Sequence, residues 1–256
     1  MPELPDIQVF ANNLNALFKG KTLTKVKVVN GKKLPDKPKQ LSMALEGKVL
    51  EEIVRSGKEM RMQFSGSVTI GLHLMLTGDI FLFDKKNDKN STIVELHFKD
   101  GSGMALTDRM RNASIRLNPE DKKGVDALSL NFKTLKKILD RKANIKNVLL
   151  DQHNIRGLGN GYSDEILWQT KISPFSIANA IPEAKVKELA STIKKVLKTA
   201  VSKISKAYPG LTHGEVKDFH KIHTKKHTQS PTGADIKTAD RGMLKTYYTD
   251  EQVLYK

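Results

Sequence analysis

The chain has 256 residues, enough for one large domain or for two ordinary domains with cores of their own. It carries 44 Lys and Arg against 28 Asp and Glu, so its formal net charge is +16, and its pI is 9.8. Such a basic excess indicates a polyanionic partner, nucleic acid first, or else a merely soluble basic surface. The lack of cysteine excludes disulfides, thiolate metal ligands and a thiol nucleophile.

The amino terminus, MPELPDIQVF, lacks the basic and apolar regions of a signal peptide. No apolar run approaches the ~18 residues of a membrane span. We therefore expect a cytoplasmic protein without membrane contact, associated with the nucleoid if it is bacterial.

The first half of the chain predicts a helix followed by strands. A helix over residues 6–17 would align Ile7, Phe10 and Leu14 on one face. Short alternating or β-branched runs, separated by Gly, Asn, Asp and Lys clusters, predict strands at residues 26–29, 68–74, 80–83, 93–98 and 114–117. Strands of this length and spacing suggest a sandwich or a barrel.

After a polar linker at residues 118–126, the hydrophobic period becomes that of helices. The pattern predicts helices at residues 132–139, around 148–150, at 160–170 and from Pro182 to about residue 206. The lysine-rich outer face of the last helix is interpreted as solvated. From His213 onward the chain is basic and polar, which fits either a small hairpin or a disordered arm.

Pro2 is the first residue with a chemical role to offer. Initiator Met is normally removed before a small residue, which would expose Pro2 as a secondary amine. An α-amino group has a pKa near ~8, so much of it is neutral at physiological pH and can attack a sugar aldehyde carbon to form an iminium. Glu3 beside it is a candidate acid/base. Alone, a proline at position 2 carries no functional meaning.

The segment 141–168, RKANIKNVLLDQHNIRGLGNGYSDEILW, is the second informative region. Gly157 and Gly159 allow a tight turn, and Asn160 opens the next helix. The backbone N–H groups at that helix start, with the Asn160 side chain, suit a phosphate. As a bare pattern, it equally fits an ordinary link between two helices.

These pieces occur together and in one order. MPELPD at the start, Ser56-Gly57-Lys58 after a strand region, and LLDQ…GLGN…YSDEILW at mid-chain resemble the formamidopyrimidine-DNA glycosylase / endonuclease VIII family. The resemblance covers nearly the whole chain and implies an α+β fold. Its expected parts are an N-terminal β-sandwich with a leading helix (residues 1–122), a helix-two-turns-helix DNA-binding domain (128–213) and a small β-hairpin finger (214–256).

The resemblance also implies a reaction and a partner. The expected protein is a monomer that binds damaged double-stranded DNA in a cleft between two lobes, removes a base and cleaves the strand by β- and often δ-elimination. Pro2 matches the Schiff-base nucleophile, and Glu3 matches the general acid/base that helps to open the sugar ring. Lys58 and Asn160 match residues that contact the phosphates beside the damaged nucleotide.

The damaged nucleotide must leave the base stack, which costs a few kcal/mol. The family fills the resulting gap with side chains from two loops. Leu76 stands where a Met is usual, although it equally fits a core strand position. Arg109 or Arg111 matches the inserted arginine, while the usual Phe of that loop is missing and Met110 or Asn112 stands near its place.

Two departures from the family bear on function. Asp6 replaces a Glu near the lesion pocket, so its carboxylate is one methylene shorter. The finger has lost its zinc ligands, because Gln229, Thr232, Tyr248 and Glu251 align with the four cysteine positions and do not form a tetrahedral zinc site. The expected finger is zincless, and neither a metal nor an organic cofactor is implied. Arg241, with Lys245 as the fallback, matches the finger arginine that binds the lesion phosphates.

The tail allows one other interpretation. His220, His223 and His227, with His213 nearby, form a histidine-rich tract of the kind that can bind zinc, or else a solvated basic arm near phosphate. The segment between Gly210 and Ile222 is short where the guanine-damage branch has a longer stretch. This favours oxidised pyrimidines over 8-oxoguanine as substrates.

Two rival functions stay open. One is a family member that binds abasic or distorted DNA without excising bases, and Asp6 and the incomplete insertion loop favour it. The other is a ribosome- or RNA-associated protein, which would not need a free N-terminal proline. With Met1 attached, Pro2 has no free amine and the chemistry is blocked.

Overall fold

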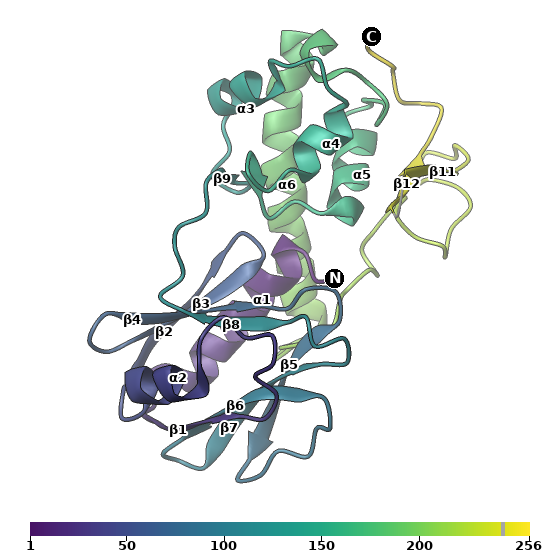
Figure 1. The fold of residues 1–256 in the computed structure, drawn as a ribbon. Coiled ribbons are helices and arrows are strands. Elements are labelled where there is room, and N and C mark those ends of the chain that lie inside the picture. Colours follow the sequence, from purple (N-terminus) through teal and green to yellow (C-terminus); the bar gives the residue numbers. More distant parts are fainter. Residues whose placement is uncertain (242–243) are drawn as a thin grey trace. The chain divides into compact units, whose positions relative to one another are not determined.

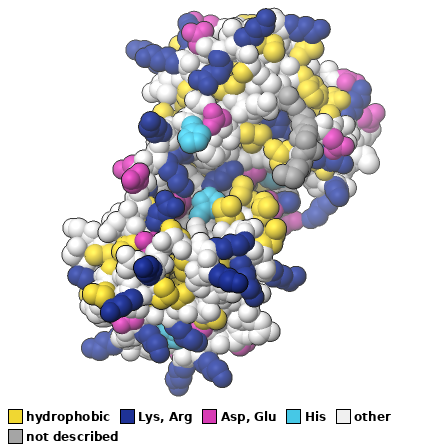
Figure 2. All heavy atoms as spheres, in the orientation of Figure 1, with side chains coloured by type: hydrophobic (Ala, Val, Ile, Leu, Met, Phe, Trp, Pro, Cys, Tyr) yellow, Lys and Arg dark blue, Asp and Glu magenta, His cyan; other side chains and the backbone are white. Residues whose placement is uncertain are grey.

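The computed structural model describes residues 1–241 and 244–256, which form two compact units (Figure 1). Unit 1 contains Met1–Asp121 and Ile204–Glu215, and unit 2 contains Lys122–Lys203 and Val216–Lys256. Lys and Arg side chains are spread over the visible face of each unit (Figure 2). Within the described ranges, no helix is long and apolar enough to cross a membrane.

Unit 1 is a sandwich of two four-stranded antiparallel sheets, which confirms the sandwich alternative. One sheet has the order β1-β6-β7-β5 and the other the order β2-β3-β4-β8. The strands are β1 (Leu23–Val28), β2 (Leu50–Ser56), β3 (Glu59–Phe64), β4 (Val68–His73), β5 (Gly78–Asp84), β6 (Thr92–Phe98), β7 (Ser102–Asp108) and β8 (Ser114–Leu117).

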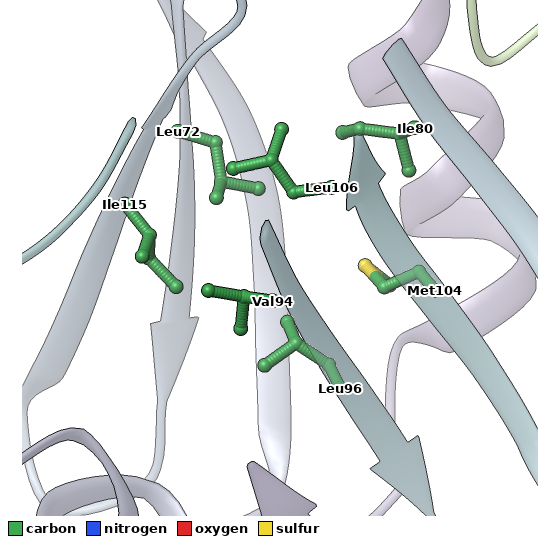
Figure 3. A pocket seen from close by; sticks show the side chains of 7 residues that line it. All are labelled: Leu72, Ile80, Val94, Leu96, Met104, Leu106 and Ile115. Atoms are coloured by element: carbon green, nitrogen blue, oxygen red, sulfur yellow. The ribbon is translucent and has the colours of Figure 1, made fainter. Parts of the chain in front are cut away.

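The sandwich holds together because alternate side chains of each strand face the opposite sheet. Leu72 and Ile115 from the second sheet share one apolar space with side chains of the first sheet, namely Ile80, Val94, Leu96, Met104 and Leu106 (Figure 3). Two helices, α1 (Leu4–Phe18) and α2 (Pro38–Leu45), add Phe10, Leu14, Leu41 and Leu45 to the same core. The leading helix predicted at residues 6–17 is confirmed.

The five predicted strands lie within or beside observed ones, but β2, β3, β7 and α2 are missing from the prediction. Strand β3 reads EMRMQF and β7 reads SGMALTD, which contain few β-branched or aromatic residues. Each is nevertheless paired on both sides, β3 between β2 and β4 and β7 between β6 and β5. Pairing with two neighbours and burial therefore override a weak local preference for the strand conformation.

Unit 2 is mainly helical, as predicted. Its elements are β9 (Val125–Asp126), α3 (Phe132–Leu139), α4 (Ile145–Leu150), β10 (Ile155–Arg156), α5 (Asn160–Gln169), the short 3-10 helix Ala178–Ala180, α6 (Glu183–Ala207), β11 (Lys237–Arg241) and β12 (Leu244–Tyr248). The last residues of α6, from Ile204, belong to unit 1. Strands β11 and β12 pair antiparallel, so the tail forms a hairpin and the disordered-arm alternative is wrong. The end of the predicted linker forms β9, which pairs in parallel with β10.

The inter-sheet core yields a first prediction. Ile115 is fully buried among the side chains of Figure 3, so Ile115→Ala should leave a cavity and lower the free energy of unfolding of unit 1 by about 3 kcal/mol. Equilibrium chemical denaturation measures this change. Met43→Ala is the control, because Met43 is 75% exposed on α2 and its loss should cost under about 0.5 kcal/mol. Equal stability of the two variants would contradict the assigned core.

Candidate active site

The amino terminus enters α1 through two buried carboxylates. Glu3 is the N-cap residue, and its backbone N–H donates to Oδ2 of Asp6 at 2.9 Å. The Asp6 side chain is 1% exposed, and that of Glu3 is also buried. A capping box of this kind satisfies the first N–H groups of a helix and fixes the path of the preceding residues. Pro2, itself buried, is thereby held at a defined place in unit 1.

Lys58 lies in the two-residue turn between β2 and β3. Gly57 supplies the positive φ of 64° that a tight hairpin turn requires at its first position. Arg55 supports the turn, because its Nη1 donates to the Gly57 carbonyl at 3.0 Å and its Nε donates to Gln8 of α1 at 2.9 Å. Burial lowers the pKa of the Lys58 ammonium from its ordinary value, while the Glu3 and Glu215 carboxylates act in the opposite sense. These two carboxylates therefore lie near the Lys58 ammonium.

The two loops expected to enter the DNA gap are joined by Asp108. Its carboxylate accepts hydrogen bonds from Thr77 Oγ1 in one loop and from the backbone N–H groups of Met110, Asn112 and Ala113 in the other, at 2.7–2.9 Å for the backbone donors. Burial raises the pKa of Asp108, but these hydrogen bonds outweigh it and leave the pKa below its ordinary value. An ionised Asp108 thus fixes both loops.

The residues at the tips of these loops are exposed. Leu76 is 58% exposed and lies between β4 and β5, so its alternative assignment to a core strand is wrong. Arg109 is exposed, and so is Arg111, whose φ is 54°. With the Asn30 amide oxygen turned toward it, the Arg111 guanidinium lies 3.2 Å away. Arg109 has the less constrained of the two arginine side chains.

In unit 2, Asn160 begins α5 directly after the glycine-rich turn. Gly157 has a φ of 102°, and Gly159 is the N-cap residue. Gln152 holds this turn together, because its amide donates to the Leu158 carbonyl at 2.7 Å and accepts from the Gly157 N–H at 2.9 Å. The Asn160 amide in turn donates to the Lys245 carbonyl of β12 at 2.9 Å. Asn160 and the finger are therefore neighbours within unit 2.

The finger is fixed to α5 by carboxylates. Asp164 forms an ion pair with Lys146 at 2.6 Å, lies within hydrogen-bond distance (2.8 Å) of the His223 ring, and accepts the Tyr247 N–H of β12 at 2.9 Å. The next residue, Glu165, accepts the three successive backbone N–H groups of residues 221–223 at 2.8–2.9 Å. A small apolar cluster of Trp168, Ile222 and Tyr247, with Ile236 packed against it, covers this network. The Asp164 and Lys146 side chains are almost fully buried, so the loss of either would leave an uncompensated charge.

Side chains at finger positions that align with the family's cysteines take part in a hydrogen-bond network. Glu251 accepts from Thr232 at 2.8 Å and from Trp168 of α5 at 3.2 Å, and it pairs with Lys171 at 2.6 Å. The Lys171 ammonium first, and then Thr232, hold the pKa of Glu251 at about 2. Tyr248 packs edge-on against Phe175, with ring centroids 5.0 Å apart. Strand pairing and this carboxylate thus hold the hairpin.

Three histidines of the tail have partners within the protein. His220 is buried and lies edge-on against Tyr162, His223 contacts Asp164, and the His213 ring lies tilted against Phe81, with ring centroids 4.4 Å apart. In the part of the chain that the structure describes, no three His, Cys, Asp or Glu side chains are grouped to hold a metal ion. Lys245 is exposed on β12, and the side chain of Arg241 lies outside the described residues.

Sequence reasoning missed several residues of this arrangement. Asp108 and Glu165 lie inside motifs already noted, but their carboxylates accept backbone N–H groups of loops, which leaves no periodic pattern in the sequence. Glu215 contacts the amino terminus only through the tertiary fold, with its carboxylate 3.1 Å from the Met1 amine. No sequence signal identifies such a contact.

Comparison with known proteins agrees with these two units. The family model of the formamidopyrimidine-DNA glycosylase N-terminal domain matches residues 1–115, and that of the H2TH domain of the same enzymes matches residues 124–208. The chain is 34% identical to the formamidopyrimidine-DNA glycosylase of Lactobacillus helveticus, over 78% of each chain. It is 32% identical to that of Wolbachia pipientis, over 79% of each.

Solved structures share the fold. The complex between Lactococcus lactis Fpg and DNA containing an abasic site has a TM-score of 0.88, covers 98% of this chain and 99% of its own, and is 21% identical. MutM in complex with DNA containing carbocyclic 8-oxo-G has the same TM-score and coverage at 22% identity. At such identities, these likenesses establish the fold.

The hydrogen bonds of Glu251 predict that the local stability of the finger depends on pH. Because the folded-state pKa of Glu251 lies at about 2, below the ordinary 4.5, its stabilisation is present above pH 4.5 and is lost as the pH falls toward 2. At neutral pH, Glu251→Gln should lower the local stability of the finger by about 1 kcal/mol, since the site is partly open to solvent. Amide hydrogen exchange of β11 and β12 measures this loss.

The difference between Glu251→Gln and the unmodified chain should shrink as the pH falls below 4.5. Asp250→Asn is the matched control, because Asp250 is exposed and pairs with Lys237 alone among the described contacts. A difference that stays constant down to pH 2 would show that Glu251 does not act through its charge.

Proposed function

The chain belongs to the formamidopyrimidine-DNA glycosylase family of DNA-repair enzymes, and we propose that it is a bifunctional glycosylase and abasic-site lyase that uses the amine of Pro2 as its nucleophile. The observation that carries the proposal is the fixed amino terminus, where Pro2 precedes a buried Glu3 near the Lys58 ammonium. A terminal amine next to a carboxylate and an ammonium is suited to attack on a sugar carbon and to the subsequent proton transfers.

In the proposed reaction, the Pro2 nitrogen attacks C1′ of the damaged nucleotide after Met1 has been removed. The N–C1′ bond forms and the bond from C1′ to the base breaks, and the departing base gains a proton equivalent to the one that the Pro2 nitrogen loses. Glu3 supplies the further proton that opens the sugar ring. The resulting iminium acidifies the C2′ hydrogen. Loss of that proton expels the 3′ phosphate by β-elimination, and a second elimination releases the 5′ phosphate.

Phosphates beside the lesion are the proposed ligands of Lys58, Asn160 and the finger. Lys58 is presented by a rigid hairpin turn, and Asn160 opens a helix whose positive end favours an anion. The Asn160 amide bond to the Lys245 carbonyl supports a joint role for the helix start and the finger. Arg241 and Lys245 are the cations proposed for the finger. A net charge of +16 is in keeping with salt-sensitive binding of duplex DNA.

The gap left by the damaged nucleotide is proposed to be filled by Leu76 and an arginine of the adjoining loop. The exposed Leu76 side chain and the loops fixed by Asp108 support this role, since an inserted side chain must be both accessible and held in place. Arg109 is favoured over Arg111, which faces Asn30.

The proposed substrates are oxidised pyrimidines in preference to 8-oxoguanine. The short segment after α6 supports this, because residues 211–214 are hydrogen-bonded to α1 and β5 and leave little free chain to close over a purine. Lactococcus lactis Fpg itself has been solved with an oxidised pyrimidine containing DNA and with a Fapy-dG containing DNA. The preference of this chain must therefore be measured directly.

The second candidate function is a binder of abasic or damaged DNA that excises nothing. Asp6 favours it, because its carboxylate is committed to the Glu3 N–H and is buried. The RNA-associated alternative accounts poorly for the family match over residues 1–115, which lies outside the H2TH domain. A monomer located in the cytoplasm remains the proposed state of the enzyme.

Borohydride trapping on a duplex with one abasic site tests the lyase mechanism. Protein shown by mass to lack Met1 should form a covalent adduct, whereas protein that retains Met1 should form none. Pro2→Gly should trap at least about tenfold more slowly, because a flexible primary amine replaces a fixed secondary one. Undiminished binding of the duplex without any adduct would favour the non-excising binder.

Measurements of base excision from different damaged duplexes test the proposed preference for oxidised pyrimidines over 8-oxoguanine. Single-turnover release of 5-hydroxyuracil or thymine glycol should be faster than release of 8-oxoguanine, with a formamidopyrimidine lesion as the third substrate. Each duplex should be compared with the same duplex carrying an abasic site, which needs no base excision. Faster release of 8-oxoguanine would overturn the assignment to oxidised pyrimidines.

A further inference from the structure

The carboxylate of Glu215, the last residue of unit 1 in the sequence, lies next to the amino terminus. The Met1 ammonium pairs with Oε2 of Glu215 at 3.1 Å. Glu215 also acts electrostatically on the half-buried Lys58 ammonium, as Glu3 does. The charged groups around the terminus are therefore Lys58, Glu3, Asp6 and Glu215, of which Asp6 is committed to the Glu3 N–H.

The segment that carries Glu215 is firmly attached to unit 1. Asn13 of α1 donates to the Leu211 carbonyl at 2.8 Å, and Thr212 donates to the Ile80 carbonyl of β5 at 3.2 Å. The Gly214 N–H donates to Asp79 at 2.8 Å. The contacts to α1 and β5 hold the segment, so the position of Glu215 does not depend on its pair with Met1.

Removal of Met1 would make the Pro2 nitrogen the terminal amine, one residue further from this carboxylate than the Met1 amine is. One residue spans at most ~3.6 Å, so the Pro2 nitrogen lies within about that distance of the place that the Met1 amine occupies. A glutamate side chain with three rotatable bonds can follow such a displacement. A neutral proline amine has a single N–H and a single lone pair, so one acceptor on the N–H is enough to fix the direction of the lone pair.

We propose that Glu215 is a further catalytic residue, whose carboxylate accepts the N–H of the Pro2 amine, directs its lone pair toward C1′ and takes its proton when the N–C1′ bond forms. This role rests on the proposed function of Pro2 as the nucleophile. Glu3 is left to protonate the sugar oxygen, so that two carboxylates divide the two proton transfers between them.

The step balances on an abasic aldehyde. The nitrogen lone pair forms the N–C1′ bond while the carbonyl π pair moves to oxygen, and the N–H proton passes to Glu215. The oxygen receives one proton from the acid and a second that corresponds to the one taken from nitrogen, and it leaves as water. The nitrogen lone pair then closes the C=N bond of the iminium.

Glu215→Gln is the decisive variant, because it keeps the shape and an acceptor oxygen but cannot take the proton. The single-turnover rate of borohydride trapping on an abasic duplex should fall by at least about tenfold, with unchanged affinity for the duplex. The rates should be compared at a pH of about 9.5, where an ordinary α-amino group is neutral, so that the charge state of the amine does not contribute. Glu215→Asp, which keeps a carboxylate, should recover part of the rate.

Glu52→Gln is the matched control, since it removes one negative charge from an exposed position of β2 in the same unit and should leave the rate unchanged. A second measurement does without DNA. Formaldehyde converts the Pro2 amine to an iminium with loss of water, and cyanoborohydride reduces it to N-methylproline, which mass spectrometry quantifies at Pro2. This labelling should also be slower in Glu215→Gln.

The two measurements separate the proposals. Trapping and labelling rates in Glu215→Gln equal to those of the unmodified chain would overturn the role of Glu215. If the unmodified chain is labelled at Pro2 but traps no abasic DNA, the proposed lyase function fails. In that case, the labelling rates alone test whether Glu215 accepts the proton of the Pro2 amine.

Discussion

A reactive group at the end of a chain is held by a covalent bond on one side only, and this constraint governs unit 1. Pro2 has no preceding residue to fix it once Met1 is gone, so its position depends on the residues after it. Glu3 and Asp6 close the first turn of α1, and Leu4 and Phe10 are completely buried beneath it. The sandwich core, which includes Ile7, thereby reaches to within five residues of the proposed nucleophile. A loss of packing under α1 would therefore displace the Pro2 amine.

The finger meets a different constraint, because a hairpin of two five-residue strands is marginal in water without further support. Four cysteines at the aligned positions would hold a metal. Here, Asp164 and Glu165 of α5 accept backbone N–H groups of the tail, and Glu251 accepts a side-chain hydrogen bond from Thr232. Each of these carboxylates bridges segments far apart in the sequence. The support is therefore distributed over several hydrogen bonds to carboxylates, and the lowered pKa of Glu251 makes its contribution sensitive to acid.

How far the sequence predicts this structure depends on the range of the interactions. The amphipathic period predicts α1 and α3, because the residues that form them are close together in the chain. Lys58 and Asn160 are expected site residues only through the resemblance of the short motifs around them to the formamidopyrimidine-DNA glycosylase family. Strands β3 and β7 were missed, since they owe their conformation to pairing on both sides. The Glu215 contact with the amino terminus was missed for a related reason: the two residues meet only when the segment after α6 is attached to α1 and β5.

In this chain of 44 basic and 28 acidic residues, the two kinds of charged side chain have different structural roles. Several carboxylates fix the backbone: Asp6 at the start of α1, Asp108 between two loops, and Glu165 at residues 221–223. Each of the three is buried and accepts backbone N–H groups of the protein, so it presents little negative charge to a polyanion. The lysines and arginines stay largely at the surface of each unit, available to phosphates (Figure 2). Glu215 differs from these three carboxylates, because one of its contacts is the terminal ammonium of Met1. Removal of Met1 would leave the Pro2 nitrogen as the terminal amine near this carboxylate, which is the physical basis for proposing that Glu215 takes part in the chemistry.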